Sequence, residues 1–384
     1  MEFDIVINGG GLVGASLATA LKSSGLKIAL VEGQALPSLD PEWDSRIYAF
    51  TPGNADFLKG LGAWQRMDMS RVQQVEEMRV FGDTGAELDF SAYQAGAPEL
   101  AFILESRLLQ HALWQGLREQ QNLTILQPAQ CAALKIDDDA AHLTLKDGRE
   151  IRTSLIVGAD GRDSWVRQQT IMPEVPTPYH QHGVVANFNT AKAHRGIAYQ
   201  WFTPDGILAL LPLPGKRISI VWSVSPERSA ELLALSPEEF AAQVTAASRR
   251  TLGELQVITP PASFALRVLN LAHLTKPRLA LIGDAAHNIH PLSGHGVNLG
   301  LRDAHELAQV LLQRGTADCG DLALLRRYEA ARQTDIMSMQ LTADTLKHLF
   351  INDNPLLRTL RNLGLSATNK LTPLKNMMVR HALN

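Results

Sequence analysis

Apolar runs at the start of the chain alternate with a glycine-rich turn and a helical pattern. Residues 3–7 are rich in β-branched side chains and have the composition of a buried parallel strand. Residues 12–23 repeat apolar positions at helical spacing up to Gly25, and residues 27–31 form a second apolar run. The order strand, helix, strand is typical of a βαβ unit, so the pattern predicts an α/β fold with a parallel sheet.

The middle of the chain has a different period. Residues 78–90 and 183–225 contain alternating polar and apolar positions, as in AYQWF, GILALLPL and RISIVWSV, which predicts an antiparallel sheet. The segment SPERSAELLALSPEEFAAQVTAA predicts two helices, each with a serine cap followed by proline. From Leu341 onward a helical tail rich in Leu, Met, Lys and Arg is expected.

Composition narrows the class of protein. The 384 residues carry a net charge of −3 without a dense Lys/Arg block, which argues against a protein that mainly binds nucleic acid. Cys131 and Cys319 form no Cys-x-x-Cys pair, which favours two reduced thiols over a disulfide or a metal site. Met1 lies two residues before an apolar strand, and no apolar run approaches the ~18 residues of a membrane span, so we expect a soluble, cytoplasmic protein.

The turn between the first two apolar runs has the pattern G-x-G-x-x-G. Gly9 makes the tight turn, Gly11 lets the backbone approach a pyrophosphate, and Gly14 lets the helix pack on the strand. Helix N-terminal amides receive the phosphate charge, and Glu32 at the end of the second run accepts the ribose hydroxyls. The unit therefore predicts a bound dinucleotide, and Glu32 favours FAD or NAD over NADP.

Three motifs, taken in order, resemble those of the flavoprotein aromatic hydroxylases of the p-hydroxybenzoate hydroxylase fold. They are G-x-G-x-x-G, then Asp160-Gly161 followed by Ser164 and Arg167, and then Gly-Asp-Ala-Ala-His from Gly283 with a downstream proline and glycines. They span nearly the whole chain. The resemblance implies a Rossmann-like FAD-binding domain, an interleaved antiparallel-sheet substrate domain and a helical C-terminal tail.

The resemblance and the element pattern together predict domain boundaries. The discontinuous FAD-binding domain is expected at residues 1–75, 100–175 and 270–345, the substrate-binding β-sheet domain at 76–99 and 176–269, and the tail at 346–384. Two interpretations of the tail stay open. It is either a packed pair of terminal helices or an amphipathic surface that touches a membrane or partner proteins.

The resemblance also implies roles for the third motif. Asp284 is expected to bind the ribityl chain of FAD, and Gly294 and Gly296 to let the backbone pass close to the isoalloxazine ring. Val297 and Asn298 begin a helix whose amides face the ring, where negative charge develops on reduction.

The candidate catalytic positions are Pro291 and His295. Pro291 resembles the family proline beside the flavin, on the side where oxygen reacts, and His295 stands where relatives have glutamine. We expect His295 near the substrate or the flavin edge, without a role as general base. His287 is expected to be structural and bonded to backbone. His287, His290 and His295 have irregular spacing and no completing cysteine or carboxylate, which argues against a metal site.

Four more residues are implied as flavin contacts. Arg46, in Asp44-Ser45-Arg46, and Arg107, in ILESRLLQHALW, fall where relatives place arginines near FAD, and Asp160 and Gly161 belong to the second motif. On spacing alone Arg46 is an ordinary loop arginine. Arg107 opens a helix with core spacing, so a structural role for it also stays open.

The segments DSRIYAF and YQWFTPDGILALLPLP, together with the ending LLRTLRNLGL, are similar to those of the ubiquinone-biosynthesis hydroxylases. That resemblance implies a monooxygenase in which reduced FAD reacts with O₂ to give a C4a-hydroperoxide, which hydroxylates the ring of a polyprenylated phenol. NAD(P)H or another reductant supplies the electrons. The implied partners are a lipophilic phenol and a membrane surface or quinone-biosynthesis complex, which places the protein at the inner face of the membrane. Three alternatives remain: a soluble aromatic substrate, a non-catalytic flavin-bound scaffold, and an NAD-dependent dehydrogenase.

Overall fold

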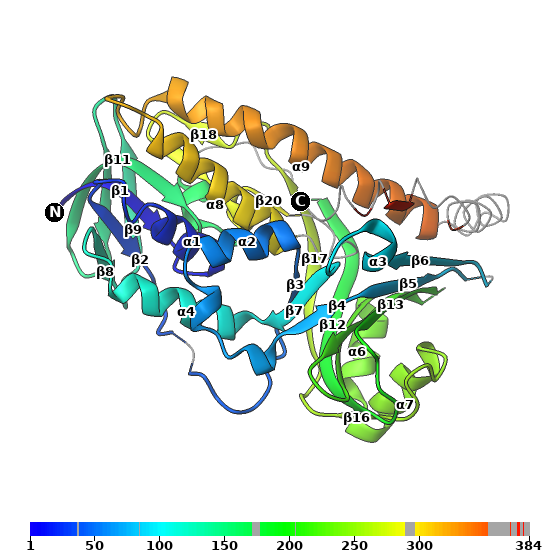
Figure 1. Cartoon of the computed structure of the whole chain (residues 1–384). Coiled ribbons are helices and arrows are strands. Elements are labelled where there is room, and N and C mark those ends of the chain that lie inside the picture. The colour runs from blue at the N-terminus through cyan, green and yellow to red at the C-terminus, as the bar shows by residue number, and fades with distance from the viewer. Residues whose placement is uncertain are drawn as a thin grey trace.

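The computed structural model describes residues 1–36, 38–83, 85–170, 177–203, 205–288 and 296–351, together with Asn369, Lys375, Asn376 and Val379. These residues form two large β-sheets, a three-stranded sheet and the helices around them (Figure 1). The predicted α/β class is confirmed.

The first sheet is built around the N-terminal strand. β1 (Glu2–Asn8) pairs in parallel with β2 (Ile28–Val31) on one side and with β11 (Glu150–Gly158) on the other. The parallel part continues with β8 (Leu123–Leu126) and β19 (Leu279–Leu281), while β9 (Cys131–Ile136), β10 (Ala141–Leu145) and β18 (Thr275–Lys276) are antiparallel additions. Parallel strands end at one edge of a sheet, so the loops that follow β1, β2, β11 and β19 gather there.

Helices pack on this sheet and on one another. α1 (Leu12–Ala20) contacts both α4 (Ser106–Arg118) and α8 (Gly296–Leu312), and α8 contacts α9 (Leu322–Ile351), which runs along the top of the molecule in Figure 1. The helices and the parallel strands share one apolar core. The helix predicted over residues 12–23 ends earlier, at Ala20, because Lys22 and Ser24 donate to carbonyls three residues back and tighten the chain into a turn.

The second sheet is mostly antiparallel, as predicted. Its strand order is β20 (His287–Asn288), β17 (Ala262–Asn270), β12 (Thr177–Thr190), β15 (Arg217–Val224), β14 (Gly206–Leu213), β13 (Ile197–Thr203), β5 (Glu77–Phe81) and β6 (Glu87–Ser91), and β16 (Leu255–Val257) also pairs with β12. One pair departs from the prediction, because β13 and β5 are parallel. β5 joins this edge from a distant part of the chain and not through a hairpin with β13, so its direction is free of the hairpin constraint.

The two faces of the second sheet differ. One carries Trp201, Leu208 and Trp222, which are buried beneath α6 (Pro226–Ala234) and α7 (Pro237–Ala247). Ser225 and Ser236 cap these helices and proline follows each cap, as predicted. The opposite face packs in part against the three-stranded sheet of β3 (Ile47–Phe50), β7 (Ala101–Glu105) and β4 (Gln73–Val75).

Short elements connect the sheets. They are α2 (Pro52–Gly60), α3 (Ala92–Ala95), α5 (Trp165–Gln168) and the 3₁₀ turns η1 (Trp64–Arg66), η2 (Met69–Arg71) and η3 (Gly283–Ala285). Thr51 caps α2 by accepting from the Asn54 amide.

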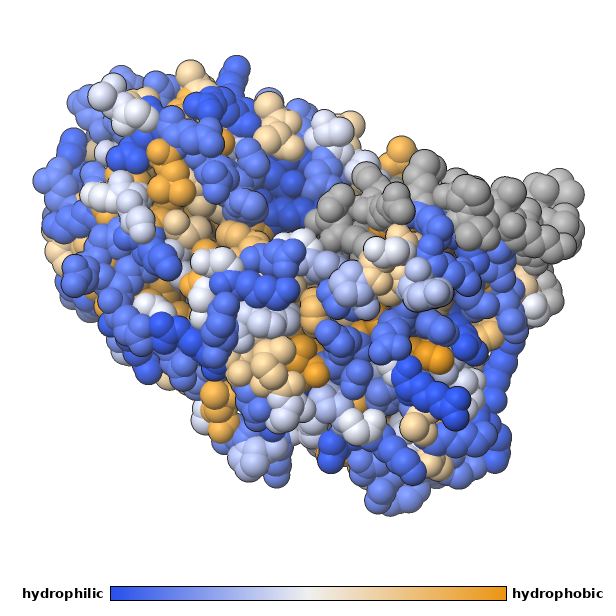
Figure 2. Space-filling view, in the orientation of Figure 1, coloured by the Kyte–Doolittle hydropathy of each residue, from blue (hydrophilic) through white to orange (hydrophobic). Residues whose placement is uncertain are grey.

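The described residues of the C-terminal tail lie against β6 and α3. Lys375 Nζ donates to the Asp89 carbonyl at 3.1 Å, and Asn376 Nδ2 donates to the Gln94 carbonyl at 2.8 Å. None of the helices in the described part of the chain combines the length and apolar character needed to cross a bilayer. Figure 2 shows a face on which polar side chains predominate and apolar ones form scattered patches.

Candidate active site

The glycines of the turn after β1 are required for different structural reasons. A Cβ on Gly9 would lie 2.4 Å from the Ala159 carbonyl oxygen, and one on Gly14 would lie 2.0 Å from the Gly9 oxygen, so backbone packing requires both glycines. Gly9 also has a φ of +111°. A Cβ on Gly11, in contrast, would meet nothing within 4 Å. Gly11 is therefore the position where the backbone is open to an approaching ligand at the N-terminus of α1.

Glu32 lies beside this turn, at the end of β2. Its Oε2 accepts the Gly10 amide at 2.7 Å and its Oε1 accepts the Gln34 amide at 2.8 Å. Trp114 of α4 donates from Nε1 to the Gly10 carbonyl at 2.8 Å. The Gly10 peptide is thus held on both sides. Trp114 was not predicted, because nothing in the local pattern of its helix marks a contact with a turn 104 residues earlier.

The second motif is a structural junction. The Asp160 carboxylate accepts from Asn8 Nδ2 at 2.9 Å, from the Val166 amide at 3.1 Å and from the Ser164 hydroxyl. It therefore joins the ends of β1 and β11 to the start of α5. Gly161, with a φ of +82°, makes the turn between them.

Arg167 connects the second motif to the third. Its side chain is 4% exposed, and it donates to the Ala285 carbonyl at 2.9 Å and to the Arg162 carbonyl at 2.8 Å. These contacts explain the fixed offsets of serine and arginine after Asp-Gly, because Ser164 caps α5 and Arg167 holds the turn that carries Asp284.

The third motif begins at a glycine in the left-handed conformation, and the buried Asp303 carboxylate anchors it. Gly283 has a φ of +62°, and its amide donates to Asp303 Oδ2 at 2.9 Å. His287 Nε2 lies 2.6 Å from the same oxygen, so His287 is structural but bonded to a buried carboxylate, where a backbone partner was expected. Pairing of β20 with β17 orients the ring toward α8, which carries Asp303. Arg332 Nε donates to Asp303 Oδ1 at 2.8 Å and brings in α9.

Asp284 itself is exposed, between the buried residues Gly283 and Ala285. No hydrogen bond to its carboxylate forms among the residues that the structure describes, and the side chain keeps accessible surface. The surrounding protein still displaces water, and this desolvation raises the pKa of the carboxyl, against the charges of His287 and Arg162.

Charged residues from three loops converge near Tyr48 of β3. Burial raises the pKa of the Tyr48 phenol, Asp284 and Asp44 raise it further, and Arg46 and Arg162 lower it. These influences mean that Asp44 and Arg46, which follow β2, lie in the same region as Asp284, which follows β19. Tyr48 was not singled out from the sequence, although it stands two residues after Arg46.

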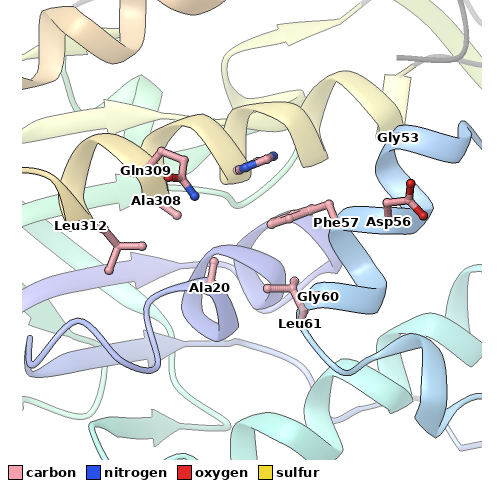
Figure 3. Close-up of a pocket in the computed structure, with 10 residues that line it drawn as sticks. Ala20, Gly53, Asp56, Phe57, Gly60, Leu61, Ala308, Gln309 and Leu312 are labelled. Carbon is pink, nitrogen blue, oxygen red and sulfur yellow. The ribbon is translucent and has the colours of Figure 1, made fainter.

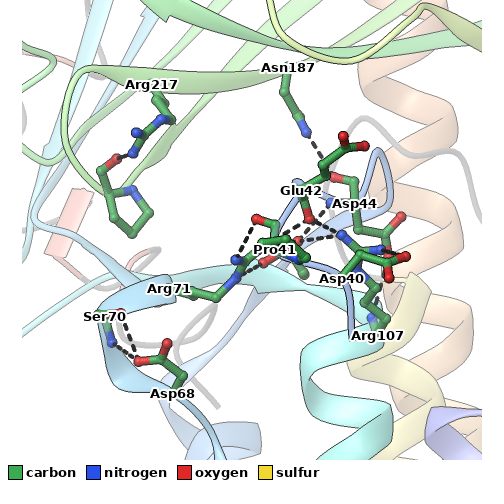
Figure 4. Close-up of polar contacts among 12 residues, drawn as sticks. Asp40, Pro41, Glu42, Asp44, Asp68, Ser70, Arg71, Arg107, Asn187 and Arg217 are labelled. Atoms are coloured by element: carbon green, nitrogen blue, oxygen red, sulfur yellow. Dashed lines mark hydrogen bonds and ion pairs between the residues drawn. The ribbon is translucent and has the colours of Figure 1, made fainter. Parts of the chain in front are cut away.

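Arg107 lies against the loop that carries Asp44 and Arg46. Its guanidinium donates to the Glu42 carbonyl and its NH1 lies 3.5 Å from Asp40 Oδ2 (Figure 4). The Arg107 amide also reaches Asp44 Oδ2 at 3.4 Å. The structure thus brings the two predicted arginines to one loop, and the Arg107 side chain holds the loop's backbone.

The start of α8 also contributes to the site. Gly296 and Val297 lie in its first turn. Asn298 is 1% exposed, and its side chain accepts from the Thr51 amide at 3.0 Å and donates to the Ala49 carbonyl at 2.7 Å. The Asn298 side chain therefore joins α8 to β3 and α2. Pro291, Gly294 and His295 lie outside the described residues.

Two hollows in the described surface differ in their relation to these loops. A groove of about 440 Å³ lies between α1, α2 and α8, lined by Phe57, Leu312 and others, and contains no predicted site residue (Figure 3). A recess of about 240 Å³ is lined by Arg162, Arg167 and Asn288 and adjoins the Asp284 turn. The second hollow is therefore the one beside the candidate site, because Asn288 in its wall donates to the Asp284 carbonyl at 2.9 Å.

The residues present fit FAD. Gly11 leaves the backbone open for a pyrophosphate, Glu32 offers a carboxylate at the ribose position, and Asp284 offers another that lacks a protein partner in the described part of the chain. A desolvated, unpaired carboxylate calls for hydroxyl donors, which a ribityl chain supplies.

Comparisons with known proteins agree with this geometry. The model of the FAD binding domain family matches residues 2–342. The chain is 36% identical to ubiquinone hydroxylase UbiL of Rhodospirillum rubrum and 35% identical to 3-demethoxyubiquinol 3-hydroxylase of Escherichia coli, covering 99% of this chain and 89% and 98% of those relatives. PqsL of Pseudomonas aeruginosa, solved with 2-aminobenzoylacetate, shares the fold at a TM-score of 0.81 and 23% identity, over 95% of this chain and 99% of PqsL. The chain therefore belongs to the FAD binding domain family and is an FAD-dependent monooxygenase.

Proposed function

We propose that this protein hydroxylates the aromatic ring of a polyprenylated phenol in ubiquinone biosynthesis. The observation that carries the proposal is the match over 99% of the chain to two relatives whose names are those of ubiquinone-pathway hydroxylases. When bound, FAD supplies the activation of O₂, with electrons from NAD(P)H or another reductant. The chain's own residues bind the cofactor, orient the phenol and exclude water.

The cofactor is held by residues from distant segments. Glu32 and the open backbone at Gly11 serve the adenosine half, and Asp284 and the first turn of α8 serve the flavin half. Arg46 and Arg107 act through the loop between β2 and β3. By analogy with the family pattern we assign Gly294 to the flavin contacts and Pro291 and His295 to the reacting side.

The sheet face opposite α6 and α7 suits an apolar ring. It carries Ala209, Leu211 and Val221, which are only partly buried. Asn187 of β12 lies on this same face and donates from Nδ2 to the Asp44 carbonyl at 2.8 Å, so the face is turned toward the Asp44 loop. An apolar wall next to a polar loop favours a lipophilic phenol over a multiply charged aromatic acid.

Tyr48 is suited to donate a hydrogen bond to the substrate or cofactor. Its phenol is protonated at neutral pH, as that of an ordinary tyrosine is, and burial and the charge of Asp284 raise its pKa further. We therefore assign Tyr48 an orienting role and not that of a general base.

We infer that the two large sheets belong to parts of the chain with different binding roles. Residues 1–75, 100–175 and 270–345 form the cofactor-binding part, and residues 76–99 and 176–269 form the part that covers the substrate. We also propose that the protein works in the cytoplasm at the inner face of the membrane, alone or in a quinone-biosynthesis complex, since a polyprenyl chain partitions into lipid. Leu341, 70% exposed on α9, is an apolar side chain available for such contact.

The test is a comparison of lipid extracts from cells with and without this protein, by mass spectrometry. A prenylated phenol that lacks one or more ring oxygens should accumulate in the deletion strain and disappear when the gene is returned. An unchanged quinone profile would remove the pathway assignment and leave a soluble aromatic substrate. Purified protein should carry a yellow chromophore with the absorption of FAD, and a colourless protein that binds no FAD would remove the flavin assignment as well.

A further inference from the structure

A buried carboxylate that belongs to none of the three motifs holds the backbone of loop 38–46, which carries Asp44 and Arg46. Glu105 is the last residue of β7 and the N-cap of α4, and its side chain is 1% exposed. Its Oε1 accepts the Asp44 amide at 2.7 Å. The loop backbone is therefore fixed to a rigid strand end at the very residue that begins Asp-x-Arg.

Arg71 neutralises the buried charge of Glu105 and also binds the backbone of the loop. Its Nε donates to Glu105 Oε2 at 2.6 Å and its NH2 to Oε1 at 2.8 Å. The remaining donors turn to the loop: NH1 reaches the Pro41 carbonyl and NH2 the Glu42 carbonyl, both at 3.1 Å (Figure 4). One guanidinium thus connects the carboxylate to two loop carbonyls, a geometry that the planar fork of arginine allows and lysine does not.

Contacts from the second sheet hold the other side of the loop. The Trp43 ring has the Arg71 guanidinium 4.6 Å from its centroid and that of Arg217 at 5.7 Å. Asn187 donates to the Asp44 carbonyl at 2.8 Å, so both peptide groups of Asp44 are fixed, one by β7 and one by β12. The loop backbone is therefore held on both sides just before Arg46, whose charge acts on Tyr48 together with that of Asp284.

We propose that Glu105, together with Arg71, is a positioning pair for the cofactor site, which sets loop 38–46 so that Asp44 and Arg46 face FAD. The inference rests on the proposed function for its cofactor. It adds two residues whose side chains act through the loop backbone.

The variant that tests it is Glu105→Gln, which keeps side-chain size but loses the charge that pairs with Arg71. Its matched control is Glu119→Gln, the same change at the C-terminal end of α4, where Glu119 pairs with Arg66 on the surface. Amide hydrogen exchange of residues 40–46 is measured in the FAD-free protein, and the FAD dissociation constant is measured by titration and corrected for the folded fraction.

We expect Glu105→Gln to speed exchange in the loop, to weaken FAD binding roughly tenfold and to increase the fluorescence of the bound flavin. Glu119→Gln should leave all three unchanged. Arg71→Lys, which keeps the charge and loses the fork, should change them in the same direction and provides the test if Glu105→Gln does not fold.

Two outcomes overturn the inference while leaving FAD binding by the unaltered protein intact. In one, loop exchange in Glu105→Gln or Arg71→Lys matches that of the unaltered protein. In the other, unfolding temperature falls but the corrected FAD affinity and flavin fluorescence stay constant, which would make the pair a purely structural ion pair. If the unaltered protein binds no FAD, the proposed function fails first and this inference fails with it.

Discussion

At the scale of single residues, the glycines of the turn after β1 serve two purposes: Gly9 and Gly14 allow close packing, and Gly11 leaves space for a ligand. A Cβ on Gly14 would overlap the Gly9 carbonyl oxygen at 2.0 Å, whereas one on Gly11 would enter open space. We expect Gly11→Ala to leave the unfolding free energy within about 0.5 kcal/mol of the original, because Gly11 has φ and ψ values that alanine adopts freely. FAD affinity should fall at least tenfold, since the methyl group would occupy the approach to the pyrophosphate.

Gly14→Ala is the contrasting variant. It should destabilise the protein by roughly 1–3 kcal/mol through forced separation of α1 from the turn. Urea unfolding and FAD titration of both variants check the pair. Equal loss of stability in the two would show that Gly11 is also a packing position and would contradict its assignment to the cofactor.

Asp284 is expected to lower the stability of the FAD-free protein while it strengthens FAD binding. Desolvation raises its pKa above the ordinary value of 3.8, so the folded protein holds this proton more strongly than the unfolded chain. Stability from this group is then present below pH 3.8 and is lost as pH rises through the raised pKa. Asp284→Asn should therefore raise the unfolding temperature of the FAD-free protein, by more at neutral pH than at pH values near 3.8, while weakening FAD binding about tenfold.

Thermal unfolding at several pH values, with and without FAD, measures both effects. An Asp284→Asn protein that is less stable than the original at every pH would contradict this account, because it would mean that the carboxylate has a stabilising partner in the folded state.

At the scale of elements, much of the fold follows from local pattern. β1, α1 and β2 lie where the apolar spacing predicts them, and Ser225 and Ser236 cap their helices as expected. These features depend on neighbours within a few residues. The parallel pairing of β13 with β5, by contrast, joins segments about 120 residues apart in the register Ile197 to Glu77, which no local period encodes.

The candidate site divides in the same way. Gly9, Gly11, Gly14, Glu32 and Asp284 could be predicted as site residues because each belongs to a short motif. Trp114 and Glu105 were missed because each acts on a turn or loop far away in sequence, at Gly10 and Asp44. Asn298 was assigned to the cofactor, but its side chain is used between α8 and β3, a distinction that only packing reveals.

The Asp303 network, which anchors the third motif to α8 and α9, can be tested by mutation. Asp303 is fully buried, and although burial opposes its ionisation, the charges and hydrogen bonds of His287 and Arg332 lower its pKa. Asp303→Asn would break the pairing of α8 with α9 and with the Gly283 turn. We expect a loss of about 3 kcal/mol in the unfolding free energy, measured in urea, because the buried Arg332 would lose its charged contact with Asp303 and keep only the one with Asp335.

Glu254→Gln, which removes an exposed ion pair with Arg250, is the matched control and should cause no measurable change. If Asp303→Asn also left the unfolding free energy nearly unchanged, water or Asp335 would be replacing the lost contacts of Arg332. The Asp303 network would then not be what joins α8 to α9.

At the scale of the whole molecule, the proposed cofactor site draws on segments that are far apart in sequence. The turn after β1, loop 38–46, the Asp284 turn and the start of α8 meet only when the first sheet is complete and the second sheet covers it. An unfolded chain has no such site, so FAD should bind the folded state alone. Mass action then predicts a gain of about 2.7 kcal/mol at a free FAD concentration 100 times the dissociation constant.

This gain should appear as a rise in unfolding temperature that increases with the logarithm of FAD concentration. Gly11→Ala supplies the internal control, because it keeps the fold and should show a clearly smaller shift than the unaltered protein at the same FAD concentration. A shift of the same size in Gly11→Ala would mean that FAD stabilises the molecule from another place. In that case the loops that gather at the edge of the first sheet would have to be assigned to a different ligand.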